Sequence, residues 1–354
     1  MSPLTPEKAS FPALLFIGNY LSARGGTRAV GEDLAERLRA RGWQVEETSH
    51  VFNRFLRLLD MLFTVWQKRN ACAVALVEVY SGAAFLWAEA VVLFLRMLKK
   101  PFVLVLHGGN LPRFARRHPG RMRRLLSGAK VVVAPSRYLQ EALRPYREDI
   151  LVIPNPLEVG KYPFRLRSSV SPRLIWLRAF HRIYRPQMAP RVLALLRQSF
   201  PEIHLTMIGP DKGDGALQET LQEIEKMGLQ NAVRIVPGVP KREVPEWLSQ
   251  GEIFLNTTDV DNTPVSVLEA LACGLCVVST SVGGIPYLLD DGKDALLVPP
   301  GDAQAMAGAV QRILTEPGLA EHLSRNARRK AEQFDWDVVL PMWEKVFSDV
   351  ISNV

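Results

Sequence analysis

Short apolar segments alternate with longer segments of helical periodicity along the whole chain. In the first half the pattern predicts strands over 13–18, 43–47, 73–80, 102–106, 130–134 and 150–153, with helices over about 26–41, 54–69, 82–98, 116–127 and 136–144. In the second half it predicts strands over 173–177, 203–208, 233–236, 252–256, 275–279 and 295–298, with helices over about 187–198, 216–227, 242–249, 264–273 and 302–314. Strands alternating with helices in this way are typical of an α/β fold, a parallel sheet with helices on both faces.

A proline-rich stretch, PNPLEVGKYPF, separates the two series and is followed by a polar segment. The chain of 354 residues is also longer than a typical single domain. We therefore expect two Rossmann-like, doubly wound domains, over residues 1–170 and 171–336.

The most apolar region, residues 71–98, is long enough to raise the question of a membrane span. A spanning helix needs about 20 mostly apolar residues in a row. Glu78, Ser81-Gly82, Glu89 and Arg96 interrupt the run, which favours a buried strand followed by an apolar helix. The first residues lack a secretory signal, so we expect a cytoplasmic protein.

Composition is that of a folded globular protein, with 47% apolar and 23% charged residues. Three cysteines exclude a disulfide framework and fit a reducing compartment. Cys273 and Cys276 have the spacing of a redox motif, but no positive charge flanks them to stabilise a thiolate. We expect them to be buried and structural.

Charge is divided unevenly between the two halves. The net charge is +8, but residues 1–170 hold 26 basic and 13 acidic side chains, a balance of +13, and the remainder sums to −5. The densest basic stretch is 113–130, which lacks the interleaved aromatic side chains of nucleic-acid stacking platforms apart from Phe114. The first half is therefore expected to meet an anionic membrane or a phosphate-bearing substrate, the plain alternative being a solvated helix face.

Several chemically suggestive residues follow directly after predicted strands. They are Gly25-Gly26, His107 with the two glycines after it, Gly209 and Asp261. In open parallel sheets ligands bind beyond the carboxyl ends of the strands. Because these residues come from both halves, the simplest expectation is a cleft between two facing domains that a ligand bridges.

The stretch TTDVDNTPVSVLEALACG supports two hypotheses. Asp259 and Asp261 form an Asp-x-Asp pair of the kind that holds a metal ion. Alternatively, Asp261 and Glu269 flank the start of a helix capped by Asn262 or Thr263 with Pro264 as its first residue and Gly274 past its end. The helix dipole and first backbone N–H groups would then bind phosphate, and Glu269 would accept hydrogen bonds from ribose hydroxyls.

The run D-x7-E followed by ALACGLCVVSTSVGGIP resembles the acid-x7-acid signature of the retaining glycosyltransferases of family 4, which have the GT-B fold. Other segments are similar to that family in order and spacing, including ARGGTRAVGEDLAERLRARGWQV, VLVLHGG, VVVAPSRYL, ILVIPNPLE, LTMIGPDKG and VRIVPGVPKREVPEWLSQGEIFLNTT. The resemblance covers nearly the whole chain. It implies that a final helix, about 337–354, crosses back onto the first domain.

The resemblance also implies roles for single residues. Asp261 would lie near the transferred sugar, Glu269 would hold the ribose, and His107 would lie at the reacting centre. The distal phosphate would be held by the turn Asn262, Thr263, Pro264, Val265 and Ser266. Close backbone approach to the phosphate and acceptor would be allowed by Gly25 and Gly26. The nucleotide base would be bordered by Gly209, Gly238, Val239 and Pro240. Taken singly, each has a plain reading: a structural histidine, an ordinary glycine turn, a helix-surface acid.

The sequence departs from the family pattern around its cations. The family places an arginine and then a lysine after the first strand of the second domain; here Arg178 is present, but Ile183 stands at the lysine position. A departing diphosphate gains negative charge that cations and helix amides must stabilise. Arg178 would supply one charge and Arg185, or else Arg182, the second. The first acid is also an Asp where Glu is usual, and Asn262-Thr263-Pro264 replaces a glycine-containing turn.

We therefore expect a retaining, metal-independent glycosyltransferase that moves a sugar from a UDP-sugar or GDP-sugar donor to a glycan, lipid-linked or other acceptor in cell-surface polysaccharide or glycolipid synthesis. No cofactor is expected, since the nucleotide sugar is a substrate, and no nucleic-acid partner. The basic first domain is expected to touch the cytoplasmic membrane face peripherally. Two alternatives remain open: a sugar-nucleotide epimerase of the same fold and a non-catalytic nucleotide-sugar-binding protein.

Overall fold

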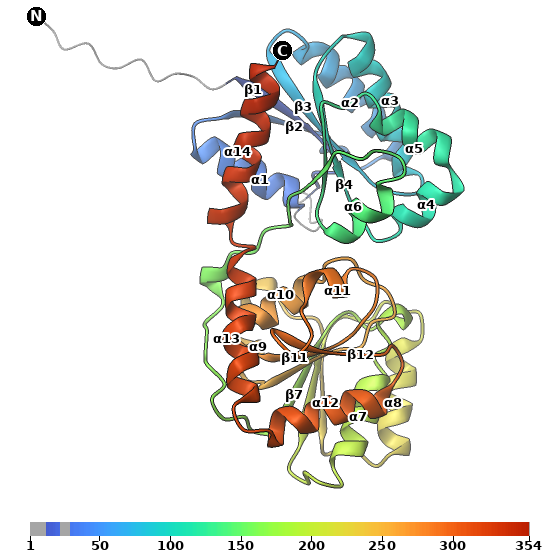
Figure 1. The fold of residues 1–354 in the computed structure, drawn as a ribbon. Coiled ribbons are helices and arrows are strands. Elements are labelled where there is room, and N and C mark those ends of the chain that lie inside the picture. The colour runs from blue at the N-terminus through green and yellow to red at the C-terminus, as the bar shows by residue number, and fades with distance from the viewer. Residues whose placement is uncertain (1–11, 22–28, 354) are drawn as a thin grey trace, which may run out of the picture. The chain divides into compact units, whose positions relative to one another are not determined.

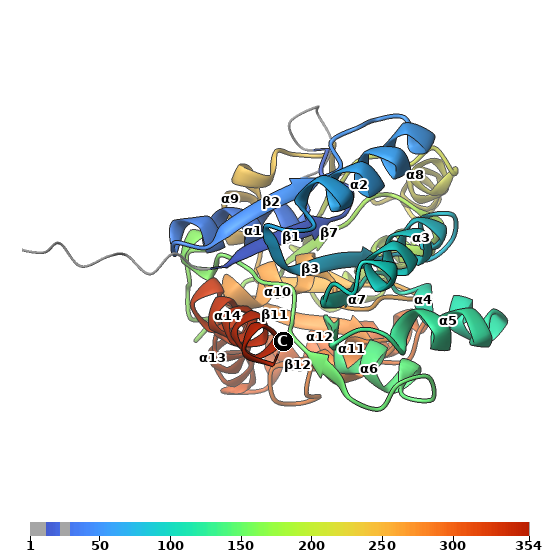
Figure 2. The ribbon, with the colours of Figure 1, turned by 90° about the horizontal axis from the view of Figure 1, so that it is seen from above.

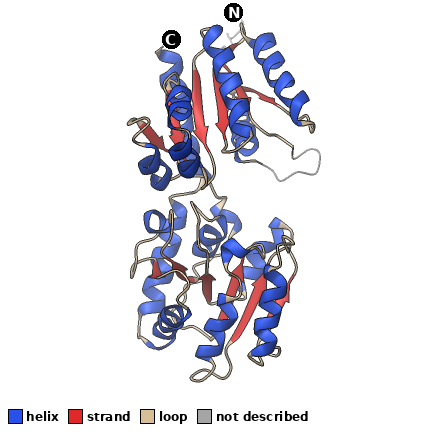
Figure 3. Ribbon diagram, turned by 90° about the vertical axis from the view of Figure 1, so that its right-hand side faces the viewer, coloured by secondary structure: helices blue, strands red, loops and turns tan. Residues whose placement is uncertain are grey.

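The computed structural model describes residues 12–21 and 29–353, and the chain divides into two compact units. Unit 1 contains the chain up to Asn155 together with Val339–Val354, and unit 2 is Pro156–Val338. Each unit is a parallel sheet with helices on both faces (Figures 1 and 3). The α/β expectation of two doubly wound sheets is confirmed.

The sheet of unit 1 has the strand order β2-β1-β3-β4-β5-β6, with every pair parallel. The strands are β1 (Ala13–Ile17), β2 (Gln44–Thr48), β3 (Cys72–Val79), β4 (Phe102–Leu106), β5 (Val131–Ala134) and β6 (Ile150–Val152). Each lies where the apolar runs predicted it. The central strands β3 and β4 are buried along almost their whole length, which is why their sequences read as continuous apolar runs rather than alternating ones.

Helices cover both faces of this sheet (Figure 2). One face packs against α2 (Arg54–Lys68), α3 (Ala84–Met97), α4 (Leu111–Arg117), α5 (Pro119–Leu126) and α6 (Arg137–Leu143). The single helix expected over 116–127 is two helices, α4 and α5. The chain breaks at His118 because Pro119 disfavours helical geometry in the residue before it, and His118 has φ −132° and ψ 58°.

The other face of this sheet packs against α1 (Val30–Ala40) and the end of the last helix, α14 (Trp336–Ser352). Phe347 of α14 places its ring 5.9 Å from the ring of Phe16 and 6.0 Å from that of Trp43. The final helix is thus part of the core of unit 1, although it follows unit 2 in the chain.

The sheet of unit 2 has the order β12-β11-β10-β7-β8-β9, again all parallel. Its strands are β7 (Arg173–Leu177), β8 (His204–Ile208), β9 (Val233–Val236), β10 (Ile253–Asn256), β11 (Cys276–Thr280) and β12 (Ala295–Val298). Its α-helices are α7 (Met188–Leu196), α8 (Ala216–Lys226), α9 (Val244–Ser249), α10 (Val265–Ala272), α11 (Ile285–Leu288), α12 (Ala303–Thr315) and α13 (Leu319–Glu332). The prediction omitted α11 and α13.

The segment after Asn155 packs on unit 2, so the units divide there and not after residue 170. Leu157, Val159 and Tyr162 belong to a hydrophobic cluster of unit 2. Fully buried Arg167 donates to the carbonyls of Cys273 and Gly251 and pairs with Glu252. Pro-rich composition indicated a linker, but these long-range contacts join it to the second core.

The apolar region 71–98 folds as a strand and a separate helix, as expected. Within the described residues, no helix combines the length and apolar character that crossing a membrane requires. The three cysteines are free and buried, and burial raises the pKa of the Cys273 and Cys276 thiols to about 12. The expectation of buried structural thiols is confirmed.

Candidate functional site

The start of α10 presents backbone donors at the carboxyl edge of the unit 2 sheet. The helix begins at Val265, and Pro264 is the N-cap residue, with no side-chain hydrogen bond. The expected cap by Asn262 or Thr263 is therefore wrong, because Pro264 keeps extended geometry and its carbonyl accepts from Val267 and Leu268. The first N–H groups of a helix have no acceptor within it, so those of Val265 and Ser266 remain for an anion.

The far end of α10 follows the prediction. Gly274 lies just beyond the C-cap residue Cys273 and has φ +72°, the left-handed conformation that terminates helices. Its N–H donates to the carbonyl of Leu271. The helix is therefore short and fixed at its C-terminal end, and all but its first residue is buried.

Arg178 and Asp261, both predicted site residues, meet at the start of α10. Arg178 follows β7 and donates from Nη2 to Oδ2 of Asp261, and its Nη1 lies 3.5 Å from Oγ of Ser266. The guanidinium lies over the Tyr184 ring, with Cζ of Arg178 4.2 Å from the ring centroid. Burial raises the pKa of Asp261, and the neighbouring Arg178 opposes that rise. The cluster places a cation and helix amides beside one half-buried carboxylate.

Glycines allow the neighbouring loops to approach this cluster. A Cβ on Gly209 would lie 1.7 Å from the carbonyl oxygen of Arg178. Cβ atoms on Gly283 and Gly284 would lie 2.1 and 1.8 Å from the carbonyl oxygens of Asp261 and Asn262. Gly209 is a predicted site residue, whereas Gly283 and Gly284 are not, although their GGIP segment is part of the family resemblance.

The structure separates the two candidates for the second cation. Arg182 is exposed and binds Glu219, 2.7 Å away, and its backbone N–H donates to Asp214. Arg185 forms a two-pronged pair with Asp259, with N–O distances of 2.9 to 3.1 Å. Only Arg185 thus lies beside the loop that carries the site.

The two carboxylates of the Asp-x-Asp pair bind different arginines. Asp259 pairs with Arg185, whereas Asp261 pairs with Arg178. In the described part of the chain, no group of three or more His, Cys, Asp or Glu side chains gathers as metal ligands would.

Glu269 lies in the second turn of α10 and is 3% exposed. Its Oε1 accepts a hydrogen bond from the Tyr162 hydroxyl at 2.8 Å and also pairs with Lys241. Burial and the adjacent Glu269 raise the pKa of Tyr162. Neither partner was predicted, since Lys241 lies 28 residues and Tyr162 107 residues away in the chain.

The predicted base-bordering residues Gly238, Val239 and Pro240 lead directly into Lys241. A Cβ on Gly238 would lie 3.1 Å from the Pro210 ring, so this loop packs against the one that follows β8. Two predicted groups, Gly209 and Gly238 to Pro240, are thereby brought together at adjacent strand ends.

His107, the predicted unit 1 residue, follows β4 and is held by its backbone. Its N–H donates to the Val79 carbonyl at 2.8 Å, and its ring stacks on Tyr80 with centroids 4.7 Å apart. Its Nε2 lies 3.9 Å from Oε1 of Glu78. Burial lowers the pKa of His107 to about 4, so the imidazole is neutral at pH 7.

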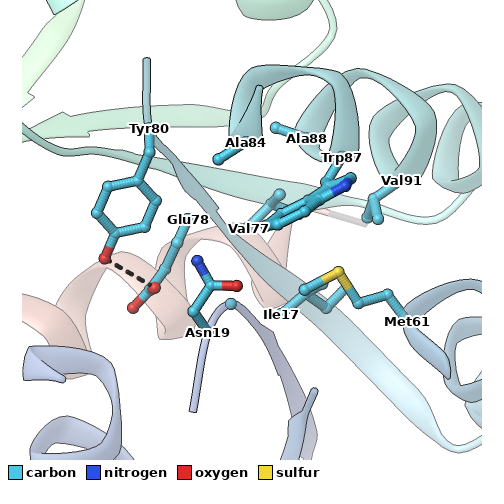
Figure 4. A pocket seen from close by; sticks show the side chains of 11 residues that line it. Ile17, Asn19, Met61, Val77, Glu78, Tyr80, Ala84, Trp87, Ala88 and Val91 are labelled. Atoms are coloured by element: carbon cyan, nitrogen blue, oxygen red, sulfur yellow. Dashed lines mark hydrogen bonds between the residues drawn. The ribbon is translucent and has the colours of Figure 1, made fainter. Parts of the chain in front are cut away.

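Glu78 is a buried carboxylate that the sequence analysis did not assign to the site. Burial raises its pKa to about 7, and the Tyr80 hydroxyl, which donates to it at 3.1 Å, counteracts part of that rise. Figure 4 shows the pair beside Asn19 in a pocket whose other side is apolar. Cβ atoms on Gly18 and Gly31 would each lie 2.4 Å from this carboxylate. The available signal was a charged residue within an otherwise apolar buried strand.

Gly25 and Gly26 lie outside the described residues. Their predicted role in allowing close backbone approach therefore stays a prediction.

Two family models match the chain, one mostly in unit 1 and the other within unit 2. The model described as Glycosyltransferase Family 4 matches residues 47–161, and that described as Glycosyl transferases group 1 matches residues 172–330. The second match contains the whole Arg178 cluster and Glu269.

Individual proteins agree with these matches. A D-inositol 3-phosphate glycosyltransferase from Paenarthrobacter aurescens (strain TC1) is 27% identical over 282 residues, which are 76% of this chain and 69% of the relative. Sucrose-phosphate synthase from Thermosynechococcus elongatus has a similar fold, with a TM-score of 0.77, 19% identity, and coverage of 97% of this chain and 100% of that one.

Anabaena Alr3699/HepE, solved in complex with UDP and glucose, has a TM-score of 0.72 at 18% identity, covering 96% of this chain and all of its own. These neighbours are GT-B proteins, which agrees with the two parallel sheets described above. Taken with the two family models, which together cover most of the chain, this shows that the protein belongs to the group 1, family 4 glycosyltransferases of GT-B fold.

Proposed function

We propose that the chain is a retaining, metal-independent glycosyltransferase whose donor is a UDP-sugar or a GDP-sugar. The observation that carries this proposal is the arrangement at α10: Arg178 and the first-turn amides at one end, and buried Glu269 one turn further. In support, the solved Anabaena HepE complex, to which this fold is similar, holds UDP and glucose.

The donor diphosphate is proposed to bind Arg178 and the N–H groups of Val265 and Ser266. These groups are already in place and would stabilise the charge that develops as the phosphate leaves. Arg185 is the better candidate for the second cation, because Arg182 is held by Glu219 and Asp214 on an exposed surface.

The ribose hydroxyls are proposed to donate to Glu269, whose carboxylate is held in position by Tyr162 and Lys241. Asp261 would act near the transferred sugar, and neutral His107 in the transfer step. The acceptor oxygen bonds to the anomeric carbon as the bond to phosphate breaks, and the acceptor proton passes to a phosphate oxygen. Attack from the face of the leaving group retains the anomeric configuration.

The acceptor is proposed to be a glycan or lipid-linked molecule of cell-surface polysaccharide or glycolipid synthesis, met at an anionic membrane. The charge of +13 over residues 1–170 favours an acceptor that carries phosphate or is presented at such a surface. The Paenarthrobacter relative is itself named for a phosphate-bearing acceptor.

The test is a thermal-shift screen of UDP-sugars and GDP-sugars in chelator, followed by NMR of the product anomer. A ligand at 100 times its Kd adds about 2.7 kcal/mol of stability, so a true donor gives a clear shift. An inverted product anomer would contradict the retaining mechanism. A donor sugar altered without any acceptor would indicate an epimerase, and binding without transfer to any acceptor would indicate a non-catalytic binding protein.

A further inference from the structure

Helix α2 in unit 1 is apolar on two opposite faces. Its inner face places Met61 and Val65 in the hydrophobic core. A surface helix normally turns polar residues outward, yet five large apolar side chains of α2 are between 50% and 86% exposed. They are Phe55, Leu56, Leu59, Phe63 and Trp66.

Helix α3 packs beside α2 (Figure 2) and also carries exposed apolar side chains. Its outward residues Leu86, Leu93 and Met97 are 56% to 71% exposed, and Phe52 before α2 is 71% exposed. We call these nine side chains the α2–α3 apolar face. Patches of this kind on a folded chain mark contact with a membrane or another protein.

Contacts of one buried arginine link the loop and the two helices that carry the α2–α3 apolar face. Buried Arg57 donates to the carbonyls of Val51 and Phe52 and to the Asn19 side chain, at 2.8 to 2.9 Å. Its guanidinium also lies over the Trp87 ring of α3. The loop before α2 and both helices are thereby fixed to one another.

Charge next to the apolar face identifies the kind of partner. Helix α5 packs against α3 and continues from α4, and residues 111–130 contain no Asp or Glu. Their exposed cations are Arg113, Arg116, Arg117, Arg123, Arg124 and Lys130. The acidic residues of α2 and α3 are engaged: Asp60 accepts from Thr48, and Glu89 pairs with Arg121. An apolar face bordered by exposed positive charge suits an anionic bilayer, where side chains enter the acyl boundary and arginines meet phosphates.

We propose that the α2–α3 apolar face inserts into the interface of an anionic phospholipid bilayer, with the α4–α5 arginines on the headgroups. Trp66, with Arg69 stacked 4.4 Å from its ring centroid, would lie at the boundary between acyl chains and headgroups. This membrane contact rests on the proposed function in one respect, namely that the acceptor is located at that membrane.

The experiment is flotation of the full chain with vesicles of phosphatidylcholine, alone and mixed with phosphatidylglycerol. We expect binding to the mixed vesicles, and at least tenfold weaker partitioning (about 1.4 kcal/mol) for the double variant Phe55→Gln/Phe63→Gln. Arg116→Gln/Arg117→Gln should weaken binding to the mixed vesicles and flatten its salt dependence. Trp66 fluorescence, obtained by difference from Trp66→Phe, should shift to the blue on binding.

The matched control is Leu151→Gln/Leu221→Gln, two exposed apolar side chains outside the face, which should bind vesicles as the unaltered chain does. Equal partitioning of the Phe55/Phe63 variant would overturn the proposal. The proposal would also be overturned if the chain did not bind vesicles but formed a dimer that the Phe55/Phe63 variant does not form. The α2–α3 apolar face would then bind a second copy of the chain. Donor thermal shifts are measured without vesicles, so a failure of the proposed transferase function is detected separately.

Discussion

Among its single residues, the candidate site includes three carboxylates that lie buried or half-buried beside specific partners. Asp261 is paired with Arg178, Glu269 with Tyr162 and Lys241, and Glu78 with Tyr80. A carboxylate removed from water is costly unless it is hydrogen-bonded or paired, so each partner stabilises the carboxylate that it contacts.

Replacing Glu269 by Ala should weaken donor binding by at least tenfold, about 1.4 kcal/mol, because a ribose hydroxyl loses a charge-assisted acceptor. Calorimetry with the donor identified in the screen measures the change. Glu219→Ala, which removes an exposed acid paired with Arg182, is the control and should leave the affinity unchanged. Equal affinity for Glu269→Ala would remove the ribose role.

Replacing His107 by Ala should reduce kcat by far more than it reduces donor affinity, because the residue is proposed to act in the transfer step. Steady-state kinetics and donor Kd are compared in the same buffer. His118→Ala, which alters an exposed histidine at the α4–α5 break, should leave both unchanged. A full turnover rate for His107→Ala would exclude it from the reaction.

Glu78 and His107 should make the free energy of unfolding depend on pH in opposite directions. The Glu78 pKa rises from 4.5 to about 7, so between these values the folded state holds a proton that the unfolded state has released, and stability falls as pH rises. The His107 pKa falls from 6.5 to about 4, so between pH 4 and 6.5 stability rises with pH. The two trends largely offset each other between pH 4.5 and 6.5.

Single variants should therefore reveal each trend. In Glu78→Gln only the His107 trend remains, so stability should rise with pH up to about 6.5. In His107→Gln only the Glu78 trend remains, so stability should fall with pH up to about 7. Each slope is at most about 1.4 kcal/mol per pH unit. Denaturant unfolding over pH 4 to 8 measures both. The same slope in both variants would contradict these pKa directions.

At the element scale, the site depends on loops that approach α10 closely. Gly284→Ala should weaken donor binding at least tenfold and destabilise unit 2, because its Cβ would lie 1.8 Å from the Asn262 carbonyl oxygen. Gly308→Ala, inside α12 with open space around its Cβ, is the control and should stabilise the chain by about 0.5–1 kcal/mol. Donor calorimetry and thermal unfolding measure both; unchanged binding by Gly284→Ala would contradict a tightly packed loop.

Helix boundaries show which local rules held. Periodicity located α10, and Gly274 ended it as expected, because helix termination by a left-handed glycine is a local effect. The N-terminus differed, since Pro264 itself serves as the cap. The omitted α13 is polar on its outer face, and its small buried residues recur at helical spacing where it packs on α10 and β11, a local signal that the prediction overlooked.

At the scale of the whole molecule, the proposed chemistry needs positive charge that the chain supplies from arginines and helix amides. Chelator should therefore leave turnover unchanged, measured as nucleotide release with and without added Mg²⁺. Loss of activity that Mn²⁺ restores would instead support a metal role for Asp259 and Asp261.

Two parallel sheets, the order of their strands along the chain and the family could all be predicted from the sequence, because apolar periodicity and the spacing of Asp261 and Glu269 are local properties of the chain. The sequence also placed His107, Gly209, Arg178 and Asp261 at strand ends, where parallel sheets present their ligands. Which side chains meet there depends on the folded chain. Lys241 and Tyr162 reach Glu269, Glu78 lies beside His107, and Arg185 turns to Asp259, because packing joins residues that are distant in the chain. Tertiary packing also leaves an apolar face of α2 uncovered, since exposure depends on what packs against a helix and not on its own sequence.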